Sequence, residues 1–361
     1  MVKELPMELI DNIVDHLWDD KPSLCRCALV SPTWLRTSRY HLYRGNACLS
    51  SSKNLESLVA ASKVSHVAAS LRSMGSLCLE DGDPAWVHRF PLVLGRVLSE
   101  IQELHIFRLT WEVVVMHPDT LTIGLMQFHR VTQLGLFDCS FRNFRQLQRL
   151  ICALPQLRDL RISRVSSKKP SLLAAESMFR PPPLTDVFLY NIVDQLLASD
   201  FLDCLVYPSS VTLRSLRLEV PRKLIPRVVT VLDAAKPSLE HLHLILEESV
   251  SASDLVELDV RRCTALRRLD LTYVHRMSLA DILRLVPDSG IGQLWISMRP
   301  GSVKREWQSA SNILGEKRFS KLHEFGIRIL DESLSEEEKQ QIKDGFEVLR
   351  GRGVKVVMHF D

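Results

Sequence analysis

The feature that most constrains this 361-residue chain is a short apolar motif that returns at near-constant spacing. An apolar residue is followed three and five positions later by two more, and ten such triplets occur between residues 74 and 327. Successive triplets begin 25 to 31 residues apart, at Met74, Ile101, Val131, Leu157, Leu184, Leu213, Leu239, Leu266, Ile291 and Leu322. Ten copies at such even spacing indicate a repeat architecture.

Each repeat is expected to contain one strand and one helix. The last two apolar residues of a triplet lie two positions apart, so they share one face of a strand. The segments between triplets carry apolar residues at helical spacing, as in Phe144, Leu147 and Leu150. One such unit cannot bury its own apolar face, so stacked units share a core. The sequence therefore predicts an α/β solenoid over residues 74–331, with parallel strands on its concave side and helices on its convex side.

The triplets resemble those of leucine-rich repeats, with one departure. That family usually has Asn or Cys three residues after the last leucine of the triplet, where the side chain bonds the turn backbone. In this chain only Cys139 fits at that position. We therefore expect degenerate repeats in which the regular ladder of side chains is mostly missing.

The two ends of the repeat region have their own patterns. Residues 332–361 are expected to form a C-terminal cap, because Ser335 and Glu338 have capping-box spacing and a final strand follows near residues 354–358. Residues 45–73 are expected to form a connecting segment, or an N-terminal repeat or cap.

The first 44 residues lack the triplet and predict three short helices. Leu5, Leu9 and Ile13 fall four apart on the first helix, and a second runs from about residue 24 to residue 30. Ser31 and Pro32 are typical of the start of a third. Because so short a segment closes little core, we expect it to pack against something else.

These residues resemble an F-box motif. The resemblance rests on Leu5-Pro6-Met7-Glu8-Leu9, Ile13 and Leu17, then on Cys27-Ala28-Leu29-Val30-Ser31 with Trp34. The continuation over residues 38–44 resembles the tail of fungal F-box proteins. The resemblance assigns residues 1–44 to an F-box, and F-box proteins of this kind often carry leucine-rich repeats after the motif.

The resemblance implies a substrate-recognition subunit of a Skp–cullin–F-box ubiquitin ligase. The F-box would dock on a Skp-type adaptor, and through it on a cullin–RING ligase, while the repeats bind an unknown target protein. Such a subunit is not itself an enzyme. The adaptor contacts carried over from the family are Leu5, Pro6, Leu9, Ile13, Leu29, Val30 and Trp34.

Other interpretations of the same residues stay open. Some or all of the seven could pack the three helices together, and the helices could merely cap the solenoid of a non-ligase interaction scaffold. An enzyme or metal site on the concave face would draw on His105, His243 and Asp270, although no third ligand at a suitable spacing accompanies a histidine pair.

A target would bind the concave face, where side chains flanking the buried pair of each triplet point away from the core. Large aromatic and arginine side chains at these positions are the residue types that protein interfaces concentrate. The candidates are Phe107, Phe137, Arg161, Phe188, Tyr190, Arg217, His243 and Trp295. The alternative for each aromatic residue is that a neighbouring loop covers it as additional core.

Composition excludes several classes of protein. The 46 basic and 43 acidic residues leave a formal charge of +3, which is too small to favour nucleic acid or an anionic membrane as partner. No uncharged stretch is long enough for a membrane helix. Eight cysteines without a Cys-x-x-Cys pair favour a reducing compartment, the cytoplasm or the nucleus. Nucleotide-binding loops and hydrolase motifs are missing from the sequence, so we expect no cofactor and no catalytic activity.

Overall fold

The computed structural model describes residues 5–44, 47–72, 74–80, 84–111, 120–169, 181–192, 194–206, 212–274, 278–287, 290–299, 307–330 and 334–360. The chain divides into two compact units, Met1–Pro182 and Pro183–Asp361, and each is described by itself.

Three helices begin the first unit, in the segment where three were predicted. They are α1 (Met7–Asp15), α2 (Lys21–Cys27) and α3 (Pro32–Arg44). The second helix begins earlier than the sequence suggested, because Asp20 caps it by accepting a hydrogen bond from the Ser23 backbone N–H at 3.1 Å. Ile10, Val14 and Leu24 form the small core of this segment.

The rest of the first unit repeats a strand followed by helical turns. Its main strands lie side by side in the order β1 (Ala47–Leu49), β2 (Ser76–Leu79), β3 (Glu103–Phe107), β4 (Gln133–Phe137) and β6 (Asp159–Ser163). The helical segments are α4 (Ser52–Ser62), α5 (Ser65–Arg72), α6 (Pro84–Val87), α7 (Phe90–Leu94), η1 (Thr120–Gly124), η2 (Leu125–Gln127) and α8 (Phe144–Cys152). Two short strands, β5 (Ser140–Phe141) and β7 (Ser166–Ser167), form a separate parallel pair.

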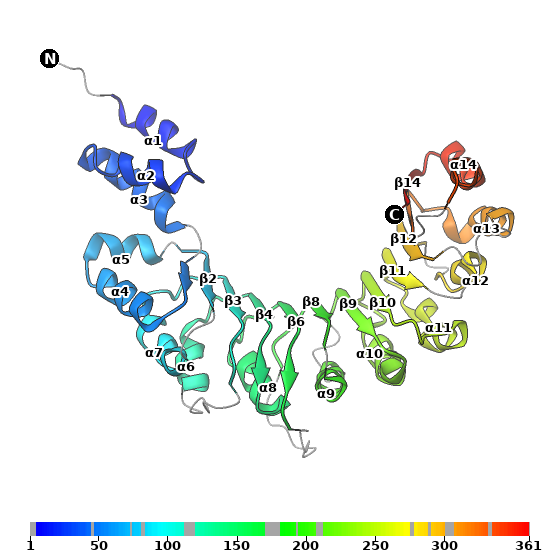
Figure 1. Cartoon of the computed structure of the whole chain (residues 1–361), viewed down its shortest axis with the longest axis horizontal. Helices are drawn as coiled ribbons and strands as arrows, with labels where there is room; N and C mark the ends of the chain where they lie inside the picture. Colours follow the sequence, from blue (N-terminus) through cyan, green and yellow to red (C-terminus); the bar gives the residue numbers. More distant parts are fainter. Residues whose placement is uncertain are drawn as a thin grey trace. The chain divides into compact units, whose positions relative to one another are not determined.

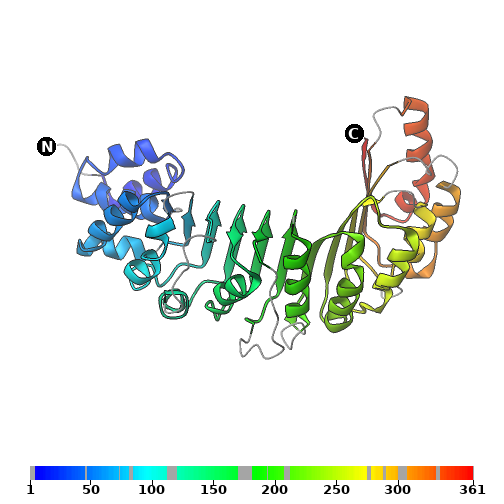
Figure 2. The same cartoon turned by 60° about the horizontal axis from the view of Figure 1, so that its bottom comes forward.

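The second unit continues the same plan. Its parallel strands are β8 (Asp186–Tyr190), β9 (Ser215–Val220), β10 (His241–Leu246), β11 (Arg268–Val274), β12 (Gln293–Met298), β13 (Glu324–Ile329) and β14 (Lys355–Phe360). Its helical segments are α9 (Gln195–Leu205), η4 (Arg222–Leu224), α10 (Ile225–Ala235), α11 (Ala252–Leu258), η5 (Val260–Arg262), α12 (Leu279–Arg284), α13 (Trp307–Leu314), η7 (Lys317–Phe319), α14 (Glu336–Gly345) and α15 (Glu347–Gly351). Within this unit the helices lie along one side of the strands (Figures 1 and 2).

The predicted repeat strands are confirmed. The last two residues of each of the ten triplets lie in a parallel strand of their unit, and every triplet residue is at most 5% exposed. Triplets also pair in register, so that Leu242 of β10 lies beside Leu216 of β9 and Leu269 of β11. The shared core between strands and helices is therefore a continuous stack of these residues in each unit, as in a repeat solenoid.

Two strands lie outside the triplets. The first, β1, pairs with β2 and is followed by α4 and α5. The last, β14, pairs with β13. The capping box at Ser335 and Glu338 is present, but the helix that follows is divided at Phe346 into α14 and α15.

In five repeats the turn that leaves the strand has the same backbone conformation, although the expected side-chain ladder is mostly missing. Arg108, Asp138, Arg164, Asn191 and Tyr273 each stand two residues after the last apolar residue of a triplet, and each has a φ between 51° and 59°. In the following position Cys139 donates from Sγ to the backbone oxygens of Ile106 and Phe137, at 3.5 and 3.4 Å. A left-handed residue therefore makes the turn in repeats that lack the Asn or Cys side chain.

Candidate functional site

The N-terminal helices expose large apolar side chains beside their small core. On α1, Ile10 and Val14 are buried, whereas Leu9 and Ile13 are 49% and 43% exposed. Leu5, just before the helix, is 50% exposed and continues the same four-residue spacing. The helix therefore presents one apolar side to its own core and a neighbouring apolar side to solvent.

The turn between α2 and α3 adds two more exposed apolar residues. Leu29 is 87% exposed and Val30 is 65% exposed, immediately before the Ser31 cap of α3. We refer to Leu5, Pro6, Leu9, Ile13, Leu29 and Val30 as the exposed apolar set.

Trp34 differs from the other six candidates for adaptor contact. Its ring is half-buried and packs against the core of Ile10, Val14 and Leu24. The structure therefore places this one candidate largely in internal packing, which the sequence could not separate from surface contact. Conversely, Trp18 lies in the turn that follows α1 and is 67% exposed. The sequence did not predict it as an adaptor contact, because its position does not follow the four-residue spacing of Leu5, Leu9 and Ile13.

Polar contacts fix how α1 lies against α3. The Thr37 hydroxyl donates to Asp11 Oδ1 at 2.5 Å, and His41 Nε2 lies 2.6 Å from Asp15 Oδ1. These contacts use a polar side of α1, so they leave the exposed apolar set uncovered within the described chain.

The second candidate surface is the open face of the strands, defined here as the face that the helices do not cover. In the first unit, Phe107 and Phe137 stack there with ring centroids 4.8 Å apart. Gly135 makes room for this pair, because an added Cβ would lie 2.6 Å from both His105 Nδ1 and Phe137 Cε2. Both phenylalanines are half-buried.

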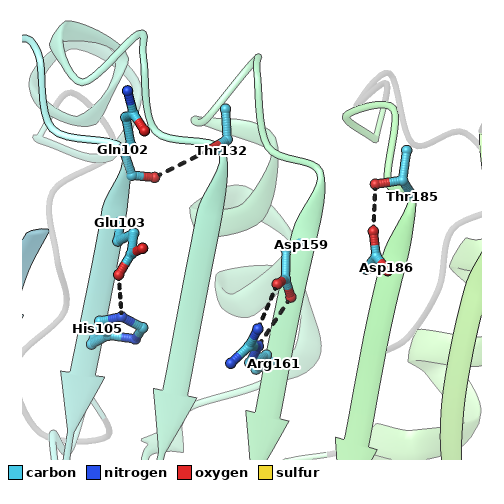
Figure 3. A network of polar contacts seen from close by, with 8 residues as sticks. All are labelled: Gln102, Glu103, His105, Thr132, Asp159, Arg161, Thr185 and Asp186. Atoms are coloured by element: carbon cyan, nitrogen blue, oxygen red, sulfur yellow. Dashed lines mark hydrogen bonds and ion pairs between the residues drawn. The ribbon is translucent and has the colours of Figure 1, made fainter. Parts of the chain in front are cut away.

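Arg161 lies on the same open face and is tied to its own strand. Its guanidinium donates to both carboxylate oxygens of Asp159, at 3.2 and 2.8 Å, and His105 contacts Glu103 in a similar way along β3 (Figure 3). These side chains therefore lie flat along their strands rather than projecting from them.

In the second unit the predicted residues fall into two groups. Phe188 and Tyr190 stack on β8 with centroids 6.0 Å apart, and Arg217 of β9 is paired in register with Phe188. His243 and Trp295 instead line a hollow of about 510 Å³ over β10–β14. Arg217 is also the register partner of His243, so the two groups adjoin on β9 and β10.

The hollow combines an aromatic floor with charged walls. The Trp295 indole lies across Gly326, where an added Cβ would come within 2.2 Å of Cδ2, and it stacks on His359 at 6.5 Å. Arg268 donates from Nε to Asp270 at 3.0 Å. Arg328 also lines the hollow.

His243 is held neutral at one side of this hollow. Burial lowers the pKa of its imidazole, with Arg217 and Arg268 acting in the same direction and Asp270 opposing them. Its Nε2 lies 2.9 Å from the Thr272 hydroxyl. A neutral imidazole in this position can donate or accept a hydrogen bond without bringing a charge to a ligand.

Arg268 and His359 were not among the predicted residues. Their signal was alternation along the strand, which places both on the open face. Arg268 precedes the buried pair of its triplet, and His359 belongs to a strand without a triplet. Neither residue therefore lies between or just after the last two apolar residues of a triplet, where target contacts were predicted.

Among the described residues there is no group of three or more His, Cys, Asp or Glu side chains that could hold a metal ion. No helix in the same ranges is long and apolar enough to cross a membrane.

No family model matches the chain, and no curated protein matches it. A solved structure of a complex of Rad7 and Elc1 from yeast is similar with a TM-score of 0.44 and 12% sequence identity, over 92% of this chain and 87% of that chain. The proposals below therefore rest on the residues of this chain.

Proposed function

We propose that the chain is a substrate-recognition subunit of a Skp–cullin–F-box ubiquitin ligase. Residues 1–44 act as the F-box and dock on a Skp-type adaptor, which joins a cullin–RING ligase, and the open face of the repeats binds a target protein. The subunit is non-catalytic and works in the cytoplasm or nucleus. It acts by holding the target close to ligase-bound ubiquitin, which raises the effective concentration of a target lysine.

The observation that carries the proposal is the exposed apolar set. A segment of about forty residues buries three apolar side chains in its core, whereas Leu5, Leu9, Ile13, Leu29 and Val30 are each at least 43% exposed. Exposed apolar groups gathered in one short segment mark a site of protein contact. Covering a side chain as exposed as Leu29 is worth about 2 kcal/mol, so a partner has enough apolar surface here to bind.

The packing of the helices favours docking over capping. The segment meets the N-terminal repeat through α3, which lies against α5. The exposed apolar set lies on α1, on the two residues just before it, and in the α2–α3 turn. If the three helices served only to cap the repeats, these residues would be the ones placed against them.

The open face supports the second half of the proposal. Stacked pairs, Phe107 with Phe137 and Phe188 with Tyr190, and the Trp295 hollow offer large rings already fixed in place. Rings held rigid before binding lose little conformational freedom when a partner covers them.

A pull-down of the purified chain with the Skp-type adaptor of its host tests the proposal. Leu9→Asp and Leu29→Asp should each weaken binding at least about tenfold, because a charge would be buried against an apolar partner. Val256→Asp is the matched control, since Val256 is similarly exposed on α11 of the other unit, and it should bind like the wild type. Trp34 is left unchanged because it packs in the core.

The alternative function is a non-ligase interaction scaffold built on the repeats. A wild-type chain that shows a cooperative unfolding transition but does not bind the adaptor would contradict the proposal and favour the scaffold. Equal binding by all four proteins would also contradict it, because adaptor contact would then lie outside the exposed apolar set.

A further inference from the structure

We infer that Cys48 and Cys78 form a redox-active pair, a dithiol on the open face that closes to a disulfide between β1 and β2 by exchange with a small disulfide such as oxidised glutathione. The inference concerns a covalent modification and does not depend on adaptor binding.

The geometry of the pair meets the requirements of a disulfide. Cys48 and Cys78 are register partners in neighbouring parallel strands, and their Sγ atoms lie 3.6 Å apart. Neighbouring strands run about 4.8 Å apart, which falls inside the range of roughly 4.4–6.8 Å that disulfides span between Cα atoms. To form a disulfide bond of about 2.05 Å, the Sγ atoms must come about 1.5 Å closer than they are.

The pair is open to a reagent, unlike Cys139 and Cys263. Cys48 is exposed and Cys78 is half-buried, whereas Cys139 and Cys263 are buried. Cys25 and Cys27 stand two positions apart on α2, a spacing that points their side chains in different directions.

The surroundings keep the thiols protonated near neutral pH. Burial raises the pKa of Cys48 to about 12, and its hydrogen bonds to Cys78 and to Glu80, the latter at 3.3 Å, act in the same direction. Burial also raises the pKa of Cys78, but the hydrogen bond that Cys48 donates to it acts in the opposite direction. The Glu80 carboxylate is itself contacted by Arg108 at 3.5 Å. The exchange should therefore be slow and should begin at Cys78, whose thiolate is stabilised by its neighbour.

The step balances without any further reagent. The Cys78 thiolate attacks one sulfur of oxidised glutathione and releases a glutathione thiolate, which takes up the proton that Cys78 lost. Cys48 then loses its proton, attacks the Cys78 sulfur of the mixed disulfide, and releases a second glutathione thiol. The dithiol is oxidised by two electrons, and one oxidised glutathione becomes two reduced molecules.

The disulfide would lock the N-terminal repeat to the first triplet. Among the described strands, β1 has β2 as its neighbour in the sheet order and stands at the end of that order. Its ladder with β2 spans three residue pairs. A covalent bond at the central pair would hold this short strand in place when the hydrogen bonds alone would let it fray.

The test equilibrates the full chain in glutathione buffers of increasing oxidised fraction, blocks free thiols, and identifies cross-linked peptides by mass spectrometry. A peptide that joins Cys48 to Cys78 should appear, and it should vanish in Cys48→Ser and Cys78→Ser but persist in Cys25→Ser. The buffer ratio at half oxidation should be at least about tenfold more reducing for the folded chain than for the chain in urea.

Two results would overturn the inference. One is a folded wild-type chain in which both thiols stay available to the blocking reagent even in the most oxidising buffer. The other is a cross-link that forms as readily in urea as in the folded chain, because the native geometry would then contribute nothing.

Discussion

Trp295 owes its position to a neighbouring residue that lacks a side chain. Its indole lies over Gly326, so any Cβ at that residue would overlap the ring at 2.2 Å. The position of the Trp295 ring on the open face therefore depends on the absence of a side chain at Gly326. The same relation holds at Gly135, which admits His105 and Phe137.

Gly326→Ala should destabilise the folded chain by about 1–3 kcal/mol, because the indole must leave its position in a packed surface. Urea unfolding followed by circular dichroism measures the change, and tryptophan fluorescence reports the movement of the ring. Gly351→Ala is the control, since nothing lies within 4 Å of its added Cβ. An unfolding midpoint equal to that of the wild type for Gly326→Ala would show that the ring does not occupy this space.

His243 should make stability depend on pH. Because burial lowers its pKa in the folded chain below the ordinary value of 6.5, the unfolded chain binds the proton more readily. Stability should therefore be complete above about pH 6.5 and fall as the pH drops toward the lowered folded value. His243→Gln should flatten this fall in thermal melts between about pH 7.5 and 5.5. His129→Gln, at an exposed histidine, should not. Equal slopes in the wild type and His243→Gln would contradict the assignment.

The position of a single residue could be predicted from the sequence where alternation along a strand fixes it. It could not be predicted where the position depends on how several elements pack together. Alternation along strands correctly placed Phe107, Phe137 and Trp295 on the open face, because a strand offers its residues only two sides. Trp34 packs in the core because of how the three helices lie against one another, and the residue spacing within one helix does not determine that packing. The arrangement of Trp295 over Gly326 likewise needs two strands in register.

Helix caps set where the elements begin. In α14 the Ser335 hydroxyl accepts from the Glu338 backbone N–H at 3.2 Å, and Glu338 accepts from the Ser335 backbone N–H at 2.9 Å. Ser335→Ala should cost about 1 kcal/mol, measured by urea unfolding, because the Glu338 backbone N–H loses the hydroxyl that accepts its hydrogen bond. Ser335→Asp should retain most of the stability, since Asp caps as well as Ser. If alanine and aspartate behaved alike, the cap would not be what holds this end of the chain.

The helical segment α1–α3 should respond differently to two leucine substitutions. Leu24→Ala empties the centre of its core and should cost about 2–5 kcal/mol, seen as faster hydrogen exchange in residues 7–44. Leu29→Ala removes a side chain that is 87% exposed and should change stability by less than about 0.5 kcal/mol. Similar exchange in both variants would mean that the segment has no core of its own.

The ten triplet strands could be predicted because burial on one face imposes a fixed spacing in each copy. The strand β1 could not, because Ala47–Leu49 is three residues long and has no triplet. The left-handed turns could not either, since Arg and Tyr occupy positions where that conformation favours glycine or asparagine. Neighbouring repeats enforce the turn there, and that constraint is not local to the sequence.

At the scale of the molecule, the apolar side chains of the repeats and those of the N-terminal segment differ in their exposure to solvent. Each unit buries its triplets almost completely, whereas residues 5–44 leave Leu5, Leu9, Ile13, Leu29 and Val30 largely exposed. Exposed apolar groups gathered in one short segment are typical of a surface that a partner covers. This contrast is the basis for the proposal that an adaptor binds the N-terminal segment.

Hydrogen–deuterium exchange of the full chain, alone and mixed with the Skp-type adaptor, tests that assignment most directly. The account predicts slower exchange in peptides that cover α1 and the α2–α3 turn, with strands β9–β13 unchanged. Unchanged exchange throughout residues 5–44 at saturating adaptor, or protection confined to the open face of the repeats, would contradict it.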